Sequence, residues 1–339
     1  YISEDPFLAG ELSAAYINGV QSQNVGTSLK HFAANSQETE RMYASSEVDE
    51  RTLREIYLTA FEIAVKKSAP WTIMASYNRI NGEYASENNW LLNELLREEG
   101  GFDGIVMSDW GAVSDRVKGV ASGLDLEMPG SRGVNDELII NAVKDGSLPE
   151  EALDAAVCRI LKWIERFVEN RQEETFDRST DHEKATRIEE ECIVLLENDI
   201  LISGADEIDE EGEPVGDNIT EEKVLPLHPE EKVLLVGGFA ENPRFQGGGS
   251  SHINASNIVS AVSVMKNYSD NISYAEGFPY DRDEIDETKY SEALKVAEDA
   301  DKVVVFAGLP DVFESEGYDR THMRLPDCQN ELEIGRAHV

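Results

Sequence analysis

The regular alternation of short apolar runs with helical patterns in residues 1–169 limits the possible folds more than any other feature. The predicted strands lie at residues 26–30, 71–75, 104–107 and 124–128, and the predicted helices at residues 50–67, 89–99 and 150–168. Strand–helix alternation predicts parallel strands joined by right-handed crossovers. We therefore expect an α/β fold in which residues 1–169 form the C-terminal half of a (β/α)8 TIM-type barrel.

The rest of the chain predicts a second, smaller α/β region. Residues 170–231 should hold a charged linker at 170–181, a helix at 183–196 and an acidic insert at 199–222 that is too poor in apolar residues to pack. Residues 232–332 predict an incomplete α/β sandwich domain, with strands at 232–238 and 302–308 and helices at 258–266 and 289–300.

Both ends of the chain suggest a piece of a longer reading frame. The sequence starts at Tyr1 without an initiator methionine, and residues 333–339 resemble a translated sequencing adapter. We exclude those seven residues from the fold prediction.

Composition excludes several classes of partner. The net charge of −38 disfavours nucleic acid and anionic membranes, and no apolar run approaches the roughly 20 residues that span a bilayer.

Cys158, Cys192 and Cys328 are too widely spaced to predict a disulfide framework or a metal site. We expect no metal and no cofactor, and a cytoplasmic rather than a secreted location. The sequence does not assign an oligomeric state.

Asp109 is the first candidate catalytic residue. It follows the buried run at residues 105–107, so it stands at the carboxyl end of a predicted strand, where α/β barrels carry their catalytic groups. Trp110 adds an aromatic face of the kind that packs against a sugar ring. The alternative is that Asp109 caps the next helix.

Polar residues also close the neighbouring predicted strands. Lys30 and His31 end one strand, Arg41 follows in a loop, and Tyr77 ends the next strand. A polyhydroxylated ring both donates and accepts hydrogen bonds, and charged partners give the stronger ones. The alternative for His31 is a structural histidine with a satisfied ring.

Five segments together resemble the β-glucosidase branch of glycoside hydrolase family 3. They stand in the order of that family and cover nearly the whole chain: Lys30-His31-Phe32 with Arg41, residues 74–78, Ser108-Asp109-Trp110, residues 246–251 and residues 314–320.

The resemblance implies a retaining mechanism on a β-linked oligosaccharide or glycoside. Asp109 would be the nucleophile, and Glu316 from the second domain would be the acid/base that must come close to it. The implied sugar contacts are Lys30, His31, Arg41, Tyr77, Trp110 and Ser250 or Ser251. A β-glucosidase is the reading the resemblance favours, with a β-xylosidase or another exo-β-glycosidase as the alternative.

The sequence has three alternatives to the β-glucosidase assignment. A sister branch that cleaves N-acetylglucosaminides carries a second histidine where this chain has Ala33-Ala34-Asn35-Ser36, which argues against that activity. A nucleotide-binding module is disfavoured because the glycines at 247–249 lie too far from the preceding strand. An inactive carbohydrate-binding fragment is the other class, and we expect the 339-residue chain alone to lack activity.

Overall fold

The computed structural model describes residues 2–171, 175–203, 207–208, 214–215 and 220–336. The chain divides into two compact units, residues 1–174 and 175–339, and each is described by itself.

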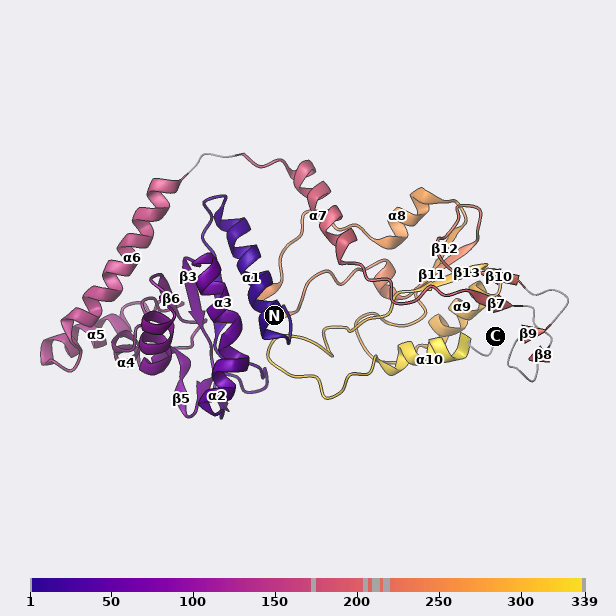
Figure 1. Cartoon of the computed structure of the whole chain (residues 1–339). Helices are drawn as coiled ribbons and strands as arrows, with labels where there is room; N and C mark the ends of the chain where they lie inside the picture. The colour runs from indigo at the N-terminus through magenta and orange to yellow at the C-terminus, as the bar shows by residue number, and fades with distance from the viewer. Residues whose placement is uncertain (1, 172–174, 204–206, 209–213, 216–219, 337–339) are drawn as a thin grey trace. The chain divides into compact units, whose positions relative to one another are not determined.

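The first unit contains both strands and helices, whose course can be followed in Figure 1. Its elements are α1 (Pro6–Gln21), β1 (Ser28–Phe32), β2 (Ser45–Ser46), α2 (Glu50–Thr52), the π-helical segment η1 (Leu53–Leu58), α3 (Thr59–Ser68), β3 (Thr72–Ala75), β4 (Arg79–Ile80), β5 (Glu83–Tyr84), the 3-10 turn η2 (Ala85–Glu87), the π-helical segment η3 (Trp90–Glu99), β6 (Ile105–Met107), α4 (Arg116–Ala121), α5 (Val134–Asp145) and α6 (Glu150–Asn170).

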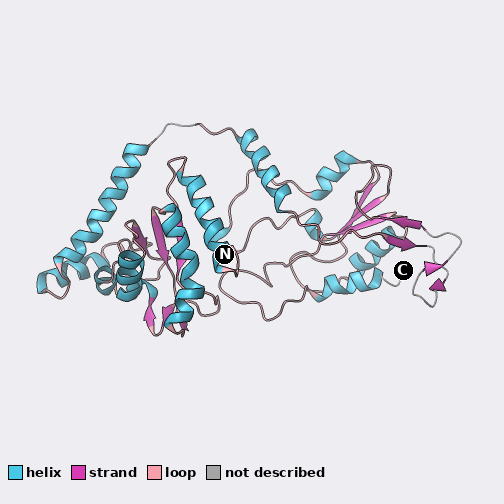
Figure 2. Ribbon diagram, in the orientation of Figure 1, coloured by secondary structure: helices cyan, strands magenta, loops and turns pink. Residues whose placement is uncertain are grey.

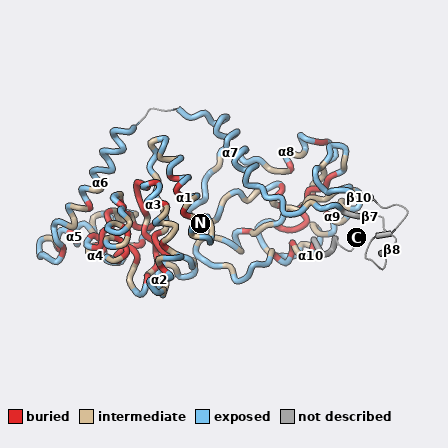
Figure 3. The backbone as a smooth tube through the Cα atoms, in the orientation of Figure 1, coloured by how far each residue is buried: buried red, intermediate tan, exposed pale blue. Residues whose placement is uncertain are grey.

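Three of these strands form one parallel sheet in the order β1-β3-β6. Figure 2 draws the strands of the chain in magenta and its helices in cyan. Parallel pairing places the carboxyl ends of the three strands at one edge of the sheet. Helical segments η1, α3 and η3 pack against it through buried residues such as Leu53, Val65 and Leu91. Figure 3 shows the buried parts of the chain in red. The predicted strands at 26–30, 71–75 and 104–107 are confirmed with slightly shifted bounds.

The fourth predicted strand, at residues 124–128, is wrong. Only an isolated parallel bridge from Leu126 to Met107 forms there. The cause is Asp125, whose carboxylate accepts the Val106 N–H at 2.8 Å. A side chain thus takes the place of the backbone carbonyl that a full strand would offer.

The second unit also contains a parallel sheet. Its elements are α7 (Arg178–Cys192), β7 (Leu201–Ser203), β8 (Glu207–Ile208), β9 (Pro214–Val215), β10 (Thr220–Glu222), β11 (Val233–Val236), the 3-10 turns η4 (Gly238–Ala240) and η5 (Gly249–Ser251), α8 (Ala261–Tyr268), β12 (Ile272–Ala275), α9 (Glu287–Ala297), β13 (Lys302–Val305) and α10 (Asp327–Arg336).

The sheet of the second unit has the order β12-β11-β13, and helices cover both of its faces. Leu234 and Val236 point to a core shared with α9 and α10, whereas Val233 and Leu235 point to a core shared with α8. Burial on both faces explains why β11 is a continuous apolar run rather than an alternating one.

Two predictions in the connecting region need correction. The predicted linker at 170–181 overlaps α7, which begins early because Asp177 caps it by accepting the N–H groups of Ser179 and Thr180 at 2.9 Å. The acidic insert at 199–222 is not entirely loop, since β7 pairs with β10 and β8 with β9 in antiparallel ladders. Parts of this insert, and residues 337–339 of the predicted adapter, lie outside the described residues.

Among the helices that the structure describes in the two units, none combines the length and the apolar content of a transmembrane segment.

Candidate active site

The predicted site residues of the first unit gather at the carboxyl edge of its sheet. His31 belongs to the end of β1, Tyr77 follows β3, and Asp109 follows β6. Strands β1 and β6 are both paired with β3, so residues that are 78 positions apart in sequence stand above one sheet edge.

Asp109 and His31 contact each other directly. The Nε2 atom of His31 lies 3.2 Å from Oδ2 of Asp109, and their side chains are only 18% and 12% exposed. The other carboxylate oxygen of Asp109 accepts the Trp110 N–H at 2.7 Å. The alternative role of Asp109 as a helix cap is wrong, because Asp115 caps α4 by accepting the Lys118 N–H.

The loop that carries Asp109 is held by the segment around Met128. The Ser108 N–H donates to Leu126 O at 2.9 Å, the Met128 N–H donates to Ser108 Oγ at 2.8 Å, and the Gly111 N–H donates to Met128 O at 2.8 Å. Gly111 has a φ of +81°, a left-handed conformation that favours glycine. The backbone on both sides of Asp109 is therefore held by hydrogen bonds.

Arg41, Tyr77 and Trp110 form a second connected group beside this pair. The Arg41 guanidinium lies 4.5 Å from the centroid of the Tyr77 ring and 2.8 Å from the Glu38 carboxylate. The Tyr77 hydroxyl donates to the carbonyl oxygen of Trp110 at 3.1 Å. The Trp110 side chain is 58% exposed, so an aromatic face is open to a ligand next to Asp109.

Burial and charge set the protonation state of His31. Burial is the largest effect and lowers the pKa of the imidazole; the Lys30 ammonium lowers it further, and the Asp109 carboxylate opposes both. Arg41 and Glu38 exert smaller, opposite effects on the same pKa. The charged side chains of the candidate site thus act electrostatically on the imidazole, and His31 is neutral at neutral pH.

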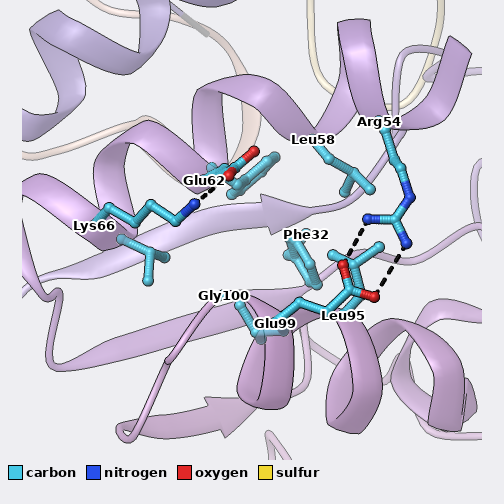
Figure 4. A pocket seen from close by; sticks show the side chains of 11 residues that line it. Phe32, Arg54, Leu58, Glu62, Lys66, Leu95, Glu99 and Gly100 are labelled. Atoms are coloured by element: carbon cyan, nitrogen blue, oxygen red, sulfur yellow. Dashed lines mark hydrogen bonds and ion pairs between the residues drawn. The ribbon is translucent and has the colours of Figure 1, made fainter. Parts of the chain in front are cut away.

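Two cavities in this unit differ in their relation to the site. A hollow of about 1020 Å³ is bordered by Lys30, His31, Asn35 and Glu38 together with residues of α1. A second cavity, of about 270 Å³, lies between α3 and η3 and has none of the predicted site residues in its wall (Figure 4). Ion pairs between Arg54 and Glu99 and between Lys66 and Glu62 cross its rim.

A buried charge network that sequence reasoning missed lies beside β6. The Asp125 side chain is fully buried, and its carboxylate contacts Arg97 Nη2 and Arg159 Nε at 2.7 Å each. The same carboxylate accepts the Val106 N–H of β6. Because the partners are 28 and 34 residues from Asp125, no local motif signals them.

The remaining predicted residues lie in the second unit. Glu316 stands in a turn closed by an antiparallel bridge between Ser315 and Tyr318, and the Ser250 N–H donates to its Oε2 atom. The Ser251 hydroxyl contacts the Gly248 carbonyl oxygen at 3.5 Å. The structure thus brings Glu316 and Ser250 together, as it does His31 and Asp109 in the first unit.

In the described part of the chain, no group of three or more histidine, cysteine, aspartate or glutamate side chains could hold a metal ion.

Comparison with protein families gives matches to both units. Residues 2–163 match the glycosyl hydrolase family 3 N-terminal domain, and residues 193–333 match the C-terminal domain of the same family. The chain is 48% identical over 343 aligned residues to thermostable β-glucosidase B of Acetivibrio thermocellus, an alignment that covers 100% of this chain and 42% of the relative. It is 43% identical over 331 residues to an exo-α-(1→6)-L-arabinopyranosidase of Bifidobacterium longum, with 97% and 42% of the two chains covered.

Solved structures of the same family also match nearly the whole chain. A family 3 β-glucosidase of Bifidobacterium adolescentis superposes with a TM-score of 0.86 and 41% identity, covering 100% of this chain and 47% of that one. The β-glucosidase 3B of Thermotoga neapolitana, in complex with α-D-glucose, gives a TM-score of 0.77 and 32% identity over 98% and 48% of the two chains. The chain therefore spans less than half the length of these relatives. The two domain matches and these identities show that the chain belongs to glycosyl hydrolase family 3.

Proposed function

We propose that the natural protein carrying this chain is a retaining exo-β-glycosidase that removes a non-reducing β-linked glucosyl unit. The observation that carries the proposal is the buried Asp109 carboxylate at the end of β6, 3.2 Å from His31 and beside the exposed ring of Trp110. The β-glucosidase names of the relatives from Acetivibrio thermocellus and Rhizobium radiobacter support the substrate class.

We propose these roles for the two carboxyl groups. An oxygen of Asp109 attacks the anomeric carbon while the glycosidic bond breaks, and Glu316 gives its proton to the departing oxygen. Glu316 then takes a proton from water, which attacks the same carbon and releases Asp109. The proposal requires both carboxyl groups to act on one sugar.

Lys30, His31, Arg41 and Tyr77 would bind sugar hydroxyls, and Trp110 would support the ring. Neutral His31 can both donate and accept a hydrogen bond, which suits a hydroxyl partner. Ser250 or Ser251 would approach the sugar from the second unit.

The proposed architecture is a partial barrel followed by a partial sandwich. In it, residues 1–169 belong to a (β/α)8 barrel, residues 170–231 connect the domains, and residues 232–332 belong to an α/β sandwich. The open edge of β1 and the apolar residues exposed on α1, such as Phe7 and Tyr16, support a larger sheet than the three described strands.

A second candidate substrate is an α-L-arabinopyranoside. The 43% identity to the Bifidobacterium longum exo-α-(1→6)-L-arabinopyranosidase over 97% of the chain favours it. Such a sugar differs from glucose at C4 and lacks the hydroxymethyl group on C5. Comparing kcat/KM for the 4-nitrophenyl β-D-glucoside, β-D-xyloside and α-L-arabinopyranoside decides among the candidates.

Trapping the covalent intermediate tests the mechanism. A 2-deoxy-2-fluoro-β-glucoside with a dinitrophenyl leaving group should inactivate the natural protein and add one fluoroglucosyl group to the peptide that carries Asp109. Asp109→Asn should prevent labelling, whereas Asp103→Asn, an exposed carboxylate at the other end of β6, should not. Labelling of another carboxylate in a protein that turns over substrate would refute the assignment.

A further inference from the structure

A glycine turn in the second unit fits against the candidate acid/base. Gly248 and Gly249 lie so close to the 314–318 loop that an added Cβ would overlap Ser315 at the first position and Glu316 at the second. Gly249 also has a φ of +82°, which disfavours any other residue. The close approach of the two loops therefore depends on the absence of a side chain.

The same turn offers a hydrogen-bond donor to the carboxylate. The Ser250 N–H donates to Glu316 Oε2. A backbone donor has little freedom to move, so it fixes the carboxylate more narrowly than a flexible side chain would. Gly317 has a φ of +101°, so the chain adopts a conformation that favours glycine directly after Glu316.

Arg244 anchors the other end of the Glu316 loop. Its Nε atom lies 2.9 Å from Asp311 Oδ1, its Nη1 atom lies 3.1 Å from Glu314 Oε2, and its Nη2 atom donates to Glu314 O at 2.8 Å. One planar guanidinium therefore holds two points of the loop, a geometry that lysine cannot reproduce.

We propose that the Gly248-Gly249-Ser250 turn and Arg244 are positioning residues that hold the Glu316 carboxyl group for proton transfer. The inference rests on the proposed function, because it concerns the residue proposed as the acid/base of that reaction. Proton transfer by a placed side chain contributes about 10²–10⁴-fold to a rate, and a displacement of about 1 Å can cost roughly 10²-fold. The turn should thus affect the protonation of the leaving group and not the attack of Asp109.

Leaving groups of different basicity separate these two effects. A 2,4-dinitrophenolate departs without a proton, whereas an alkoxide needs one. In the natural protein, Gly249→Ala should lower kcat/KM for methyl β-glucoside at least about 10-fold more than for 2,4-dinitrophenyl β-glucoside, by analogy with a Glu316→Ala reference. Added azide, which attacks the glycosyl-enzyme without a base, should raise kcat of the variant on the dinitrophenyl substrate.

Gly247→Ala is the matched control. A Cβ at Gly247 would meet only Ser251 Oγ, at 3.1 Å, and should change the two kcat/KM values equally or not at all. Arg244→Lys provides a second test that keeps the charge and avoids the glycine strain. It should show the same dependence on leaving group even if Gly249→Ala fails to fold.

Equal losses on both substrates in Gly249→Ala, or in Arg244→Lys if the former is unfolded, would overturn the positioning role. If the unchanged protein hydrolyses neither substrate, or the fluorosugar labels a residue other than Asp109, the proposed function is refuted. The positioning role, which rests on that function, is then refuted as well. The wild-type measurement thus separates the two failures.

Discussion

The imidazole Nε2 of His31 lies 3.2 Å from the carboxylate Oδ2 of Asp109, although β3 separates their two strands in the sheet. The contact is made possible by the parallel arrangement, which brings the ends of β1 and β6 to one edge. Because both side chains are largely buried, a change in the charge of one is felt strongly by the other.

Removing the imidazole should impair catalysis more than folding. We expect His31→Ala to lower kcat/KM for an aryl β-glucoside by about 10²-fold, since hydrogen bonds to sugar hydroxyls strengthen as the oxocarbenium-like state forms. Steady-state kinetics and thermal unfolding of the natural protein measure the two effects. His182→Ala, at an exposed position of α7, is the control. A lower Tm with unchanged kinetics would instead support the structural role considered for His31.

The shifted pKa of His31 should make stability depend on pH. Burial and Lys30 lower the pKa in the folded state, while the unfolded chain keeps a value of about 6.5. Between the two values the unfolded chain binds more protons, so the free energy of unfolding falls as pH drops below about 6.5. Urea denaturation from pH 7.5 to 5 should show this slope in the wild type and a smaller one in His31→Gln.

The Asp109 carboxylate should raise the pKa of His31 from the level that burial alone would set. Asp109→Asn should therefore lower that pKa further, which an NMR titration of the imidazole measures. An upward shift in the variant would contradict the arrangement of charges described above.

The buried network around Asp125 should contribute strongly to stability. Asp125→Asn leaves the largely buried Arg97 and the partly buried Arg159 without their shared anion, and breaking a buried pair in this way costs about 3–5 kcal/mol. Glu55→Gln removes an exposed pair with Arg51 and should cost less than about 1 kcal/mol. Chemical denaturation of both variants gives the comparison, and similar small losses would refute the importance of the network.

The three cysteines should differ in reactivity. Burial raises the pKa of the Cys328 thiol to about 11, whereas Cys158 and Cys192 are exposed. Since the thiolate is the reactive form, iodoacetamide at neutral pH should modify Cys158 and Cys192 well before Cys328. Peptide mapping over time measures the order, and early modification of Cys328 would contradict its burial beside α9.

The sequence alone located the strand ends that carry the candidate site. Apolar runs followed by polar residues placed His31, Tyr77 and Asp109 at the ends of β1, β3 and β6, and the structure has them there. The pattern was informative because strands of a parallel sheet that are buried on both faces read as continuous apolar segments.

Features that depend on distant contacts were not readable. The segment at residues 124–128 has the composition of a strand, but the Asp125 carboxylate, which contacts Arg97 and Arg159, also accepts the Val106 N–H that strand pairing would use. The sequence predicts a helix from residue 183, whereas α7 begins at Arg178 because Asp177 caps it there. The role of Arg244 depends on partners some 70 residues away.

The two outer strands of the first sheet, β1 and β6, are not equivalent. On the β6 side, the Asp125 side chain accepts the Val106 N–H and the 125–128 segment runs alongside, so the outer backbone groups of β6 already have partners. On the β1 side, none of the described strands pairs with the outer edge. Additional strands, whether from the same polypeptide or from an aggregating neighbour, can therefore join this sheet directly at β1, whereas on the β6 side they would meet the 125–128 segment first.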